Sequence, residues 1–251
     1  MSRRKKIIVG NWKMNPESLR EAVRIFSKIK KSSSRLDTEI IICPPAIYLN
    51  NLTSGRIKIG AQDVSAETKG AHTGEISAEM LAKNNIKYVI VGHSERRSMG
   101  ETDEIINKKI ETALFYGLKI ILCVGESKRD EHGEYLNYLK SQLKNSLKRI
   151  NRKYLKNILI AYEPLFTIGR KDFEAMSPHD IHQIVILIRK NLLDHFSDPL
   201  AAKVPILYGG SVSVENAALI VEGGEVNGLL IGRQSLNPEQ FGEIIRRVAR
   251  V

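Results

Sequence analysis

Three ionisable residues of different chemistry, Lys13, His93 and Glu163, each follow a short apolar run that is rich in β-branched residues. A carboxylate that ends an apolar strand is costly to bury unless it is paired or used. Taken singly, the lysine could be a surface side chain and the histidine a core residue bonded to the backbone. Together, the three groups suit abstraction of a proton beside a carbonyl, in which a base takes the proton and two donors stabilise the enediolate oxygens.

Glycines near the C-terminus of the chain predict a place for the anionic part of a substrate. Gly209-Gly210-Ser211 and Gly232-Arg233 each follow an apolar run. Barrel proteins often bind phosphate through backbone N–H groups at turns of this kind. A structural explanation is also open, since tight turns with φ > 0 require glycine. The position of both turns at the ends of predicted strands favours phosphate.

The sequence lacks the motifs that several other kinds of catalysis need. The sequence has neither a G-x-S-x-G nucleophile elbow nor a Walker loop. His179 and His182 come nearest to paired metal ligands, but they lie at a predicted helix start, far along the chain from the other candidates. We therefore expect no metal site. Cys43 and Cys123 are far apart and form no C-x-x-C, which indicates two reduced, structural thiols.

Eight short apolar runs recur along the chain, and each is nearly continuous in hydrophobicity rather than alternating. This pattern is typical of parallel strands that are buried on both faces. The predicted strands are Ile7 to Val9, Glu39 to Cys43, Ile57 to Ala61, Tyr88 to Gly92, Leu118 to Val124, Ile158 to Tyr162, Val204 to Tyr208 and Gly228 to Ile231.

Helical patterns fill most of the intervals between these runs. Apolar residues recur at i, i+4 and i+7 from Ala22, Ile106, Ile181 and Phe241. Asn15-Pro16-Glu17 and Ser177-Pro178-His179-Asp180 each offer a cap followed by proline, so both predict a helix start. The intervals after the second and third strands are weaker, although Glu79 to Ala82 suits a helix. Leu136, Leu139, Leu143, Leu147 and Ile150 also have helical spacing, with basic residues on the opposite, solvated face.

Eight such units with no linker and no low-complexity segment predict a (β/α)8 TIM barrel, an α/β fold, as a single domain over residues 1–251. The rival is an open, doubly wound sheet. That fold usually carries a glycine-rich fingerprint after its first strand, and Gly10-Asn11-Trp12-Lys13 is not one. In a barrel the carboxyl ends of the strands meet on one rim, so Lys13, His93, Glu163 and the glycine turns are expected to converge there.

Composition says more about the class of protein and its location than about the chemistry of the site. The chain has 251 residues, of which 42% are hydrophobic and 27% charged, and these values are ordinary for a globular protein. No apolar run approaches the ~18 residues that span a membrane, and Ile7-Ile8-Val9 is too short for a secretory signal, so we expect a cytoplasmic protein with no membrane partner. The formal charge of +11 could serve nucleic acid, a membrane surface or an anionic substrate.

Six motifs, in order along the whole chain, resemble those of the triosephosphate isomerase family. They are Gly10 to Asn15, Gly70 to Ser77, Val91 to Arg97, Cys123 to Glu126, Ala161 to Pro164 and Tyr208 to Val212. The resemblance implies interconversion of dihydroxyacetone phosphate and glyceraldehyde 3-phosphate without a cofactor. It also implies a homodimer, in which the loop around Thr73 inserts into a second subunit beside its Asn11 and Glu95.

The same resemblance implies a role for each site residue. Glu163 would move the proton, His93 would polarise the carbonyl, and Lys13 with Asn11 would stabilise the enediolate. Glu95 and Glu126 are expected to support the site by pairing with nearby bases such as Lys13 or Arg96. Tyr208 and Ser211 would latch a closing loop over the substrate. Backbone N–H groups would hold the phosphate at Gly169, Ser211, Gly232 and Arg233.

The sequence departs from the family pattern mainly after Glu163. It reads Pro164-Leu165-Phe166 where Pro-Val-Trp is usual, and the next residues, including Arg170 and Lys171, also differ. Arg233 stands where a second glycine is usual. A related isomerase of a tetrulose phosphate is therefore an alternative. A barrel recruited to bind nucleic acid is not expected, because Lys13, His93 and Glu163 are all intact and no RNP-like or zinc-finger motif appears.

Overall fold

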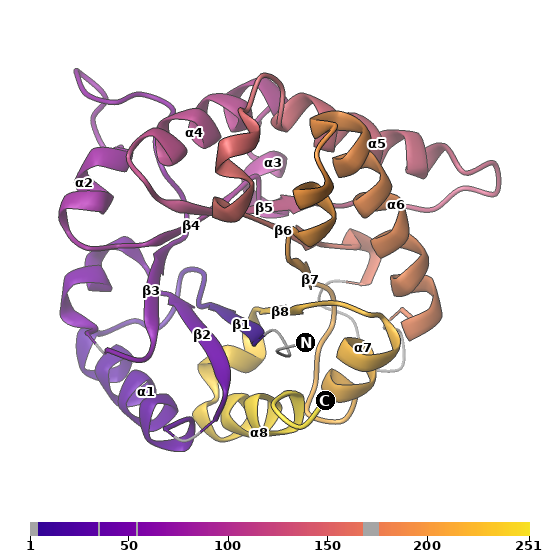
Figure 1. Cartoon of the computed structure of the whole chain (residues 1–251). Coiled ribbons are helices and arrows are strands. Elements are labelled where there is room, and N and C mark those ends of the chain that lie inside the picture. The colour runs from indigo at the N-terminus through magenta and orange to yellow at the C-terminus, as the bar shows by residue number, and fades with distance from the viewer. Residues whose placement is uncertain (1–4, 35, 54, 168–175) are drawn as a thin grey trace.

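Eight parallel strands form a closed barrel in chain order, with β1 paired to both β2 and β8. The computed structural model describes residues 5–34, 36–53, 55–167 and 176–251. Figure 1 looks into the barrel and shows the helices arranged around it. The strands are β1 Lys6–Asn11, β2 Thr38–Cys43, β3 Lys58–Ala61, β4 Tyr88–Val91, β5 Lys119–Val124, β6 Ile158–Tyr162, β7 Ile206–Tyr208 and β8 Gly228–Ile231.

The strands are buried on both faces, which is why their sequences are continuously apolar. One set of side chains fills the inside of the barrel, and Val9, Ile41, Ile90 and Ile121 belong to it. The alternate set, such as Ile8 and its neighbours on other strands, packs outwards against the helices. The predicted (β/α)8 barrel is confirmed, and all eight predicted strands are present with ends within two residues of those expected.

Closure of the barrel requires one particular close approach. At the β1–β8 seam Ile7 pairs with Gly228. A Cβ atom at position 228 would overlap the backbone of Ile7, so only glycine lets the two strands meet.

Most connections are helical, as the periodicity predicts. The α-helices are α1 Leu19–Ser32, α2 Ala78–Lys83, α3 Ser94–Ser98, α4 Asp103–Phe115, α5 Glu134–Ser146, α6 Pro178–Phe196, α7 Ala217–Gly223 and α8 Pro238–Val248. Short 3-10 helices are η1 Ala46–Asn51, η2 Arg152–Asn157, η3 Leu165–Thr167, η5 Pro199–Lys203 and η6 Arg233–Leu236. The start of α6 is confirmed, because the Ser177 side chain accepts a hydrogen bond from the N–H of Asp180 and proline follows it.

Two expectations about the helices are wrong. The first helix does not start at Asn15-Pro16-Glu17; its cap is Ser18, which accepts from the N–H of Glu21. After β2, where the helical pattern is weak, the described residues form the 3-10 helix η1. The helix expected over 136–150 ends at Ser146, although Leu147 and Ile150 remain buried beyond it. Apolar spacing records which residues are buried, and these residues are buried without the backbone staying helical.

In the described ranges, no helix combines the length and the apolar character needed to cross a bilayer.

Candidate active site

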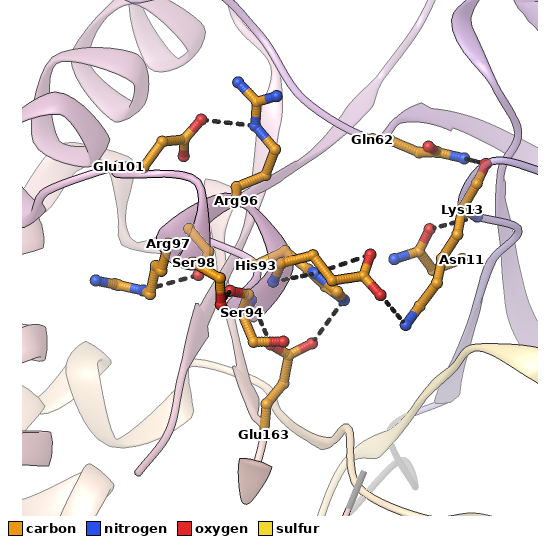
Figure 2. A network of polar contacts seen from close by, with 12 residues as sticks. Asn11, Lys13, Gln62, His93, Ser94, Arg96, Arg97, Ser98, Glu101 and Glu163 are labelled. Atoms are coloured by element: carbon orange, nitrogen blue, oxygen red, sulfur yellow. Dashed lines mark hydrogen bonds and ion pairs between the residues drawn. The ribbon is translucent and has the colours of Figure 1, made fainter. Parts of the chain in front are cut away.

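The carboxylate of Glu163 lies at the carboxyl end of β6, and its residue is only 2% exposed. One oxygen, Oε2, accepts a hydrogen bond of 3.1 Å from the backbone N–H of Ser94. The other, Oε1, lies 3.3 Å from Nε2 of His93. Figure 2 shows the Glu163 side chain directed at this pair from β6, while His93 and Ser94 come from the end of β4 and the start of α3. The predicted meeting of the carboxylate and the imidazole is therefore present.

The orientation of the His93 ring is fixed by its other nitrogen. Nδ1 accepts a hydrogen bond of 3.2 Å from the backbone N–H of Glu95, because His93 is the residue that caps α3. An Nδ1 that accepts leaves Nε2 to carry the ring hydrogen. The ring therefore presents an N–H donor towards Glu163, which is the arrangement needed to polarise a substrate oxygen placed beside it.

Lys13 is held in a conformation that a non-glycine residue seldom adopts, with φ of 53°. Its N–H donates to the Asn11 side-chain oxygen at 3.0 Å, and its carbonyl accepts from Gln62 at 2.8 Å. The ammonium lies 2.6 Å from a carboxylate oxygen of Glu95. Contacts on both sides thus hold a strained residue at the end of β1, as is common at functional sites. The expected pairing of Glu95 with Lys13 is present.

Lys13, His93 and Glu163 line one cavity of about 350 Å³, which is open to solvent. Glu163, His93 and the ends of β1, β7 and β8 all contribute to its wall. Its described lining is Asn11, Trp12, Lys13, Asn15, His93, Glu163, Gly209, Gly210, Ser211, Val212, Leu230, Ile231, Gly232, Arg233, Gln234 and Leu236. The carboxyl ends of distant strands have thus brought the predicted trio and both glycine turns together.

Two of the glycines at the cavity, Gly209 and Gly210, are required for close packing and not for a left-handed backbone. None of Gly209, Gly210 and Gly232 has a positive φ, so the tight-turn explanation is wrong for these positions. A Cβ atom at Gly209 would lie 2.9 Å from Cγ of Glu163, and one at Gly210 would overlap the hydroxyl of Tyr208. The turn after β7 can therefore pass directly beside the catalytic candidate only because it has no side chains.

Tyr208 and Ser211 lie next to the segment that follows Glu163. Tyr208 is fully buried, and burial raises the pKa of its hydroxyl. Ser211 donates a hydrogen bond of 2.8 Å to the carbonyl of Thr167. Gly169, predicted to hold phosphate, lies outside the described residues, as do Arg170 and Lys171.

Glu126 pairs with a nearby base, as expected, but the base is Arg129 and neither of the two that the sequence suggested. Its Oε1 accepts from the Tyr162 hydroxyl at 2.7 Å and from Nε of Arg129 at 3.1 Å. The expected bases are engaged elsewhere, Lys13 with Glu95 and Arg96 with Glu101. The Glu126 side chain, just after β5, accepts hydrogen bonds from Tyr162 and Arg129, and it is not among the described residues that line the cavity.

Several contributors to the site were not predicted. Gln62 directly follows β3 and ties Lys13 to the end of β2 by donating to the carbonyls of both Lys13 and Cys43. The rule that strand ends carry the site would have found it. The N–H of Ser94 and the side chain of Arg129 left no such signal, because one is a backbone group and the other lies in a loop.

The sequence profile described as "Triosephosphate isomerase" matches residues 6–248. The chain belongs to the triosephosphate isomerase family. A "Triosephosphate isomerase" of Alkaliphilus metalliredigens is 39% identical over 248 residues, covering 96% of this chain and 99% of the relative. Another from Dehalococcoides mccartyi (strain BAV1) is 42% identical over 250 residues, covering 97% and 96%. The resemblance carried by the six motifs is therefore confirmed.

A solved structure of the same family extends the likeness to three dimensions. The crystal structure of triosephosphate isomerase from Bartonella henselae superposes with a TM-score of 0.86 at 34% identity, covering 99% of this chain and all of that one. The likeness runs over the whole barrel, so the family assignment and the observed fold agree.

Proposed function

We propose that this chain is a triosephosphate isomerase that interconverts dihydroxyacetone phosphate and D-glyceraldehyde 3-phosphate through an enediolate. The observation that carries the proposal is the pairing of a buried carboxylate with an imidazole N–H, 3.3 Å apart, on a cavity that also holds the Lys13 side chain. A base and an electrophile at this spacing can act on adjacent carbons of one small substrate. Membership of the family supports the assignment to triose phosphates.

In the proposed reaction the Glu163 carboxylate removes a proton from the carbon beside the carbonyl. The electron pair of that C–H bond forms the new carbon–carbon double bond, and the carbonyl π pair moves to oxygen. His93 stabilises this oxygen through its Nε2–H, and Lys13 with Asn11 stabilises the negative charge. A second proton passes through Nε2 of His93 from the hydroxyl on the first carbon to the former carbonyl oxygen. Return of the first proton from Glu163 to the former carbonyl carbon then leaves a new carbonyl on the first carbon, so atoms and electrons balance without a cofactor.

The burial of Glu163 strengthens this chemistry. Its side chain is 3% exposed, so little water competes for the carboxylate oxygens. A hydrogen bond to a buried carboxylate is stronger than the same bond in water, and preorganised donors need no reorganisation during the reaction.

The phosphate of the substrate is proposed to bind where the turns after β7 and β8 meet the cavity. Ser211, Gly232 and Arg233 line this part, and their backbone N–H groups are the proposed donors, together with that of Gly169. Lys13 extends towards the same region, since a Cβ atom at Gly232 would lie 3.4 Å from Cε of Lys13. One ammonium could therefore serve both the phosphate and the enediolate ends of a three-carbon substrate.

Steady-state kinetics with purified protein test the proposal. We expect kcat/KM for glyceraldehyde 3-phosphate near the diffusional ceiling of roughly 10⁸ M⁻¹s⁻¹. Glu163→Gln should remove most of it, whereas Glu239→Gln, a change of an exposed carboxylate that pairs with Lys28 and is not among the residues lining the cavity, should not. Folded protein that turns over tetrose phosphates faster than triose phosphates would contradict the substrate assignment.

We further propose that the chain acts as a homodimer in the cytoplasm. The loop around Thr73 is exposed from Glu67 to Glu75, and Met14, next to Lys13, is 94% exposed. An apolar side chain so open beside a catalytic candidate is suited to cover by a second copy. Sedimentation of wild-type protein should give twice the chain mass, and Thr73→Arg should shift the equilibrium towards monomer. A wild-type monomer at micromolar concentration would refute this assembly.

A further inference from the structure

Arg129 lies in the loop between β5 and α5, outside the lining of the cavity, yet it contacts both flanks of Glu163. Nε donates to Oε1 of Glu126 at 3.1 Å, and a terminal nitrogen donates to the Tyr162 hydroxyl at 3.2 Å. The Tyr162 hydroxyl donates to the same Glu126 oxygen at 2.7 Å. The three side chains therefore form a closed hydrogen-bonded triangle, and Tyr162 is the residue immediately before Glu163.

The flat guanidinium of Arg129 also packs on the other flank. Its carbon lies 5.5 Å from the ring centroid of Phe166 and 5.0 Å from that of Tyr135. Both distances fall within the range in which a cation is attracted to an aromatic face. Phe166 follows Glu163 by three residues, so one side chain contacts the chain before and after the carboxylate.

The backbone beside the triangle is bonded directly to Glu163 and its neighbour. The N–H of Glu163 donates to the carbonyl of Val124 at 2.8 Å, and the N–H of Leu165 donates to the carbonyl of Glu126 at 3.0 Å. Gly125, between them, has no space for a Cβ atom because the carbonyl of Glu163 occupies it. A displacement of segment 124–126 would therefore also displace the backbone of Glu163, with which it is in direct contact.

Glu126 makes this segment sensitive to the loss of Arg129. Its side chain is only 2% exposed, whereas that of Arg129 is 26% exposed. A buried carboxylate that loses its cation must either protonate or move towards water. Either change alters the hydrogen bonds that the Tyr162 hydroxyl makes at the end of β6.

We propose that Arg129 is a positioning residue for the isomerisation: it holds Glu126, Tyr162 and Phe166 together and so fixes the carboxylate of Glu163 towards His93 and Ser94. The inference rests on the proposed function for its kinetic readout. Its structural content, that Arg129 sets the place of Glu163, is independent of the substrate.

The first test compares Arg129→Met with wild-type protein in steady-state kinetics. A positioning role predicts that kcat falls by about tenfold to a hundredfold while KM stays within about threefold, because the phosphate site is untouched. Arg129→Lys should recover only part of kcat, since an ammonium can pair with Glu126 but cannot make both hydrogen bonds and stack on Phe166. Arg152→Met, an exposed arginine, is the matched control and should leave both constants unchanged.

A double variant separates positioning from mere loss of stability. Glu126→Gln combined with Arg129→Met removes the unpaired buried charge and should restore the melting temperature, but it leaves the triangle broken and kcat low. Recovery of kcat together with the melting temperature would overturn the proposal. Crystal structures add a readout that needs no activity: Glu163 in Arg129→Met should lose its contact with Ser94, and an unmoved Glu163 would also overturn it. Inactive wild-type protein would instead refute the proposed function, and the structural comparison would still decide the inference.

Discussion

Shortening the catalytic carboxylate by one methylene group gives the most direct test of the site geometry. Glu163→Asp keeps the charge and the backbone but withdraws the carboxylate by about one carbon–carbon bond, or ~1.5 Å. In the native protein its oxygens lie 3.1 Å from the N–H of Ser94 and 3.3 Å from Nε2 of His93. After the change both separations would exceed hydrogen-bonding distance unless the backbone moved, and the buried backbone of β6 allows little movement.

The expected loss follows from how steeply proton transfer depends on placement. A misplacement of about 1 Å can slow the reaction roughly a hundredfold, so a shift of ~1.5 Å predicts that turnover falls by about a hundredfold to a thousandfold. This corresponds to about 2.7 to 4 kcal/mol of lost transition-state stabilisation. KM should change little, because the proposed phosphate contacts come from β7 and β8.

The assay is steady-state isomerisation in both directions, with circular dichroism and melting temperature as checks of folding. Glu239→Asp, an exposed change of the same kind, is the matched control and should keep full activity. A Glu163→Asp variant whose turnover stays within tenfold of the wild-type rate would show that the carboxylate position does not limit the reaction. The reasoning from the observed distances would then be refuted.

Three further predictions follow from other parts of the chain. Burial raises the pKa of both thiols, Cys43 and Cys123. Native protein at pH 8 should therefore not react with a thiol reagent. The free energy of unfolding should decrease above about pH 8.5, because the thiols of the unfolded chain ionise there and those of the folded chain do not. That decrease should be weaker in a variant with alanine at both positions. Gly228→Ala should prevent closure of the barrel and yield insoluble or unfolded protein, and soluble protein with a wild-type melting temperature would contradict the observed close approach to Ile7. Lys13→Met should lower kcat/KM by at least about a thousandfold by removing a cation from the reacting end, as measured with the same assay, and a loss below tenfold would exclude a direct role.

The amino-acid sequence predicted the fold well because the burial of a segment determines the hydrophobic pattern of its own residues. Strands enclosed by helices on one side and the barrel interior on the other must be apolar at nearly every position, and this pattern located all eight strands. The capped start of α6 was equally local. The first helix start was wrong, since Asn15-Pro16 has the composition of a cap but Ser18 makes the capping hydrogen bond.

The candidate site was predicted as a set of residues and, apart from the pairing of Glu95 with Lys13, not as a set of contacts. Lys13, His93 and Glu163 were found because they follow predicted strands, and in a barrel the carboxyl ends of all strands lie on one rim. The other hydrogen bonds of the site could not be predicted, because partners such as Ser94 and Glu163 lie 69 residues apart and no resemblance or local pattern pairs them.

The three carboxylates at strand ends show most clearly what tertiary structure decided. In the sequence Glu95, Glu126 and Glu163 stand in similar settings, each within a few residues of an apolar run. In the folded chain Glu95 pairs with Lys13, and Glu126 turns away to Arg129 and Tyr162. Only Glu163 is buried on the cavity beside the His93 ring. Local sequence determines which residues are buried and in which element, whereas the use of a buried charge depends on donors that arrive from distant segments only when the barrel closes.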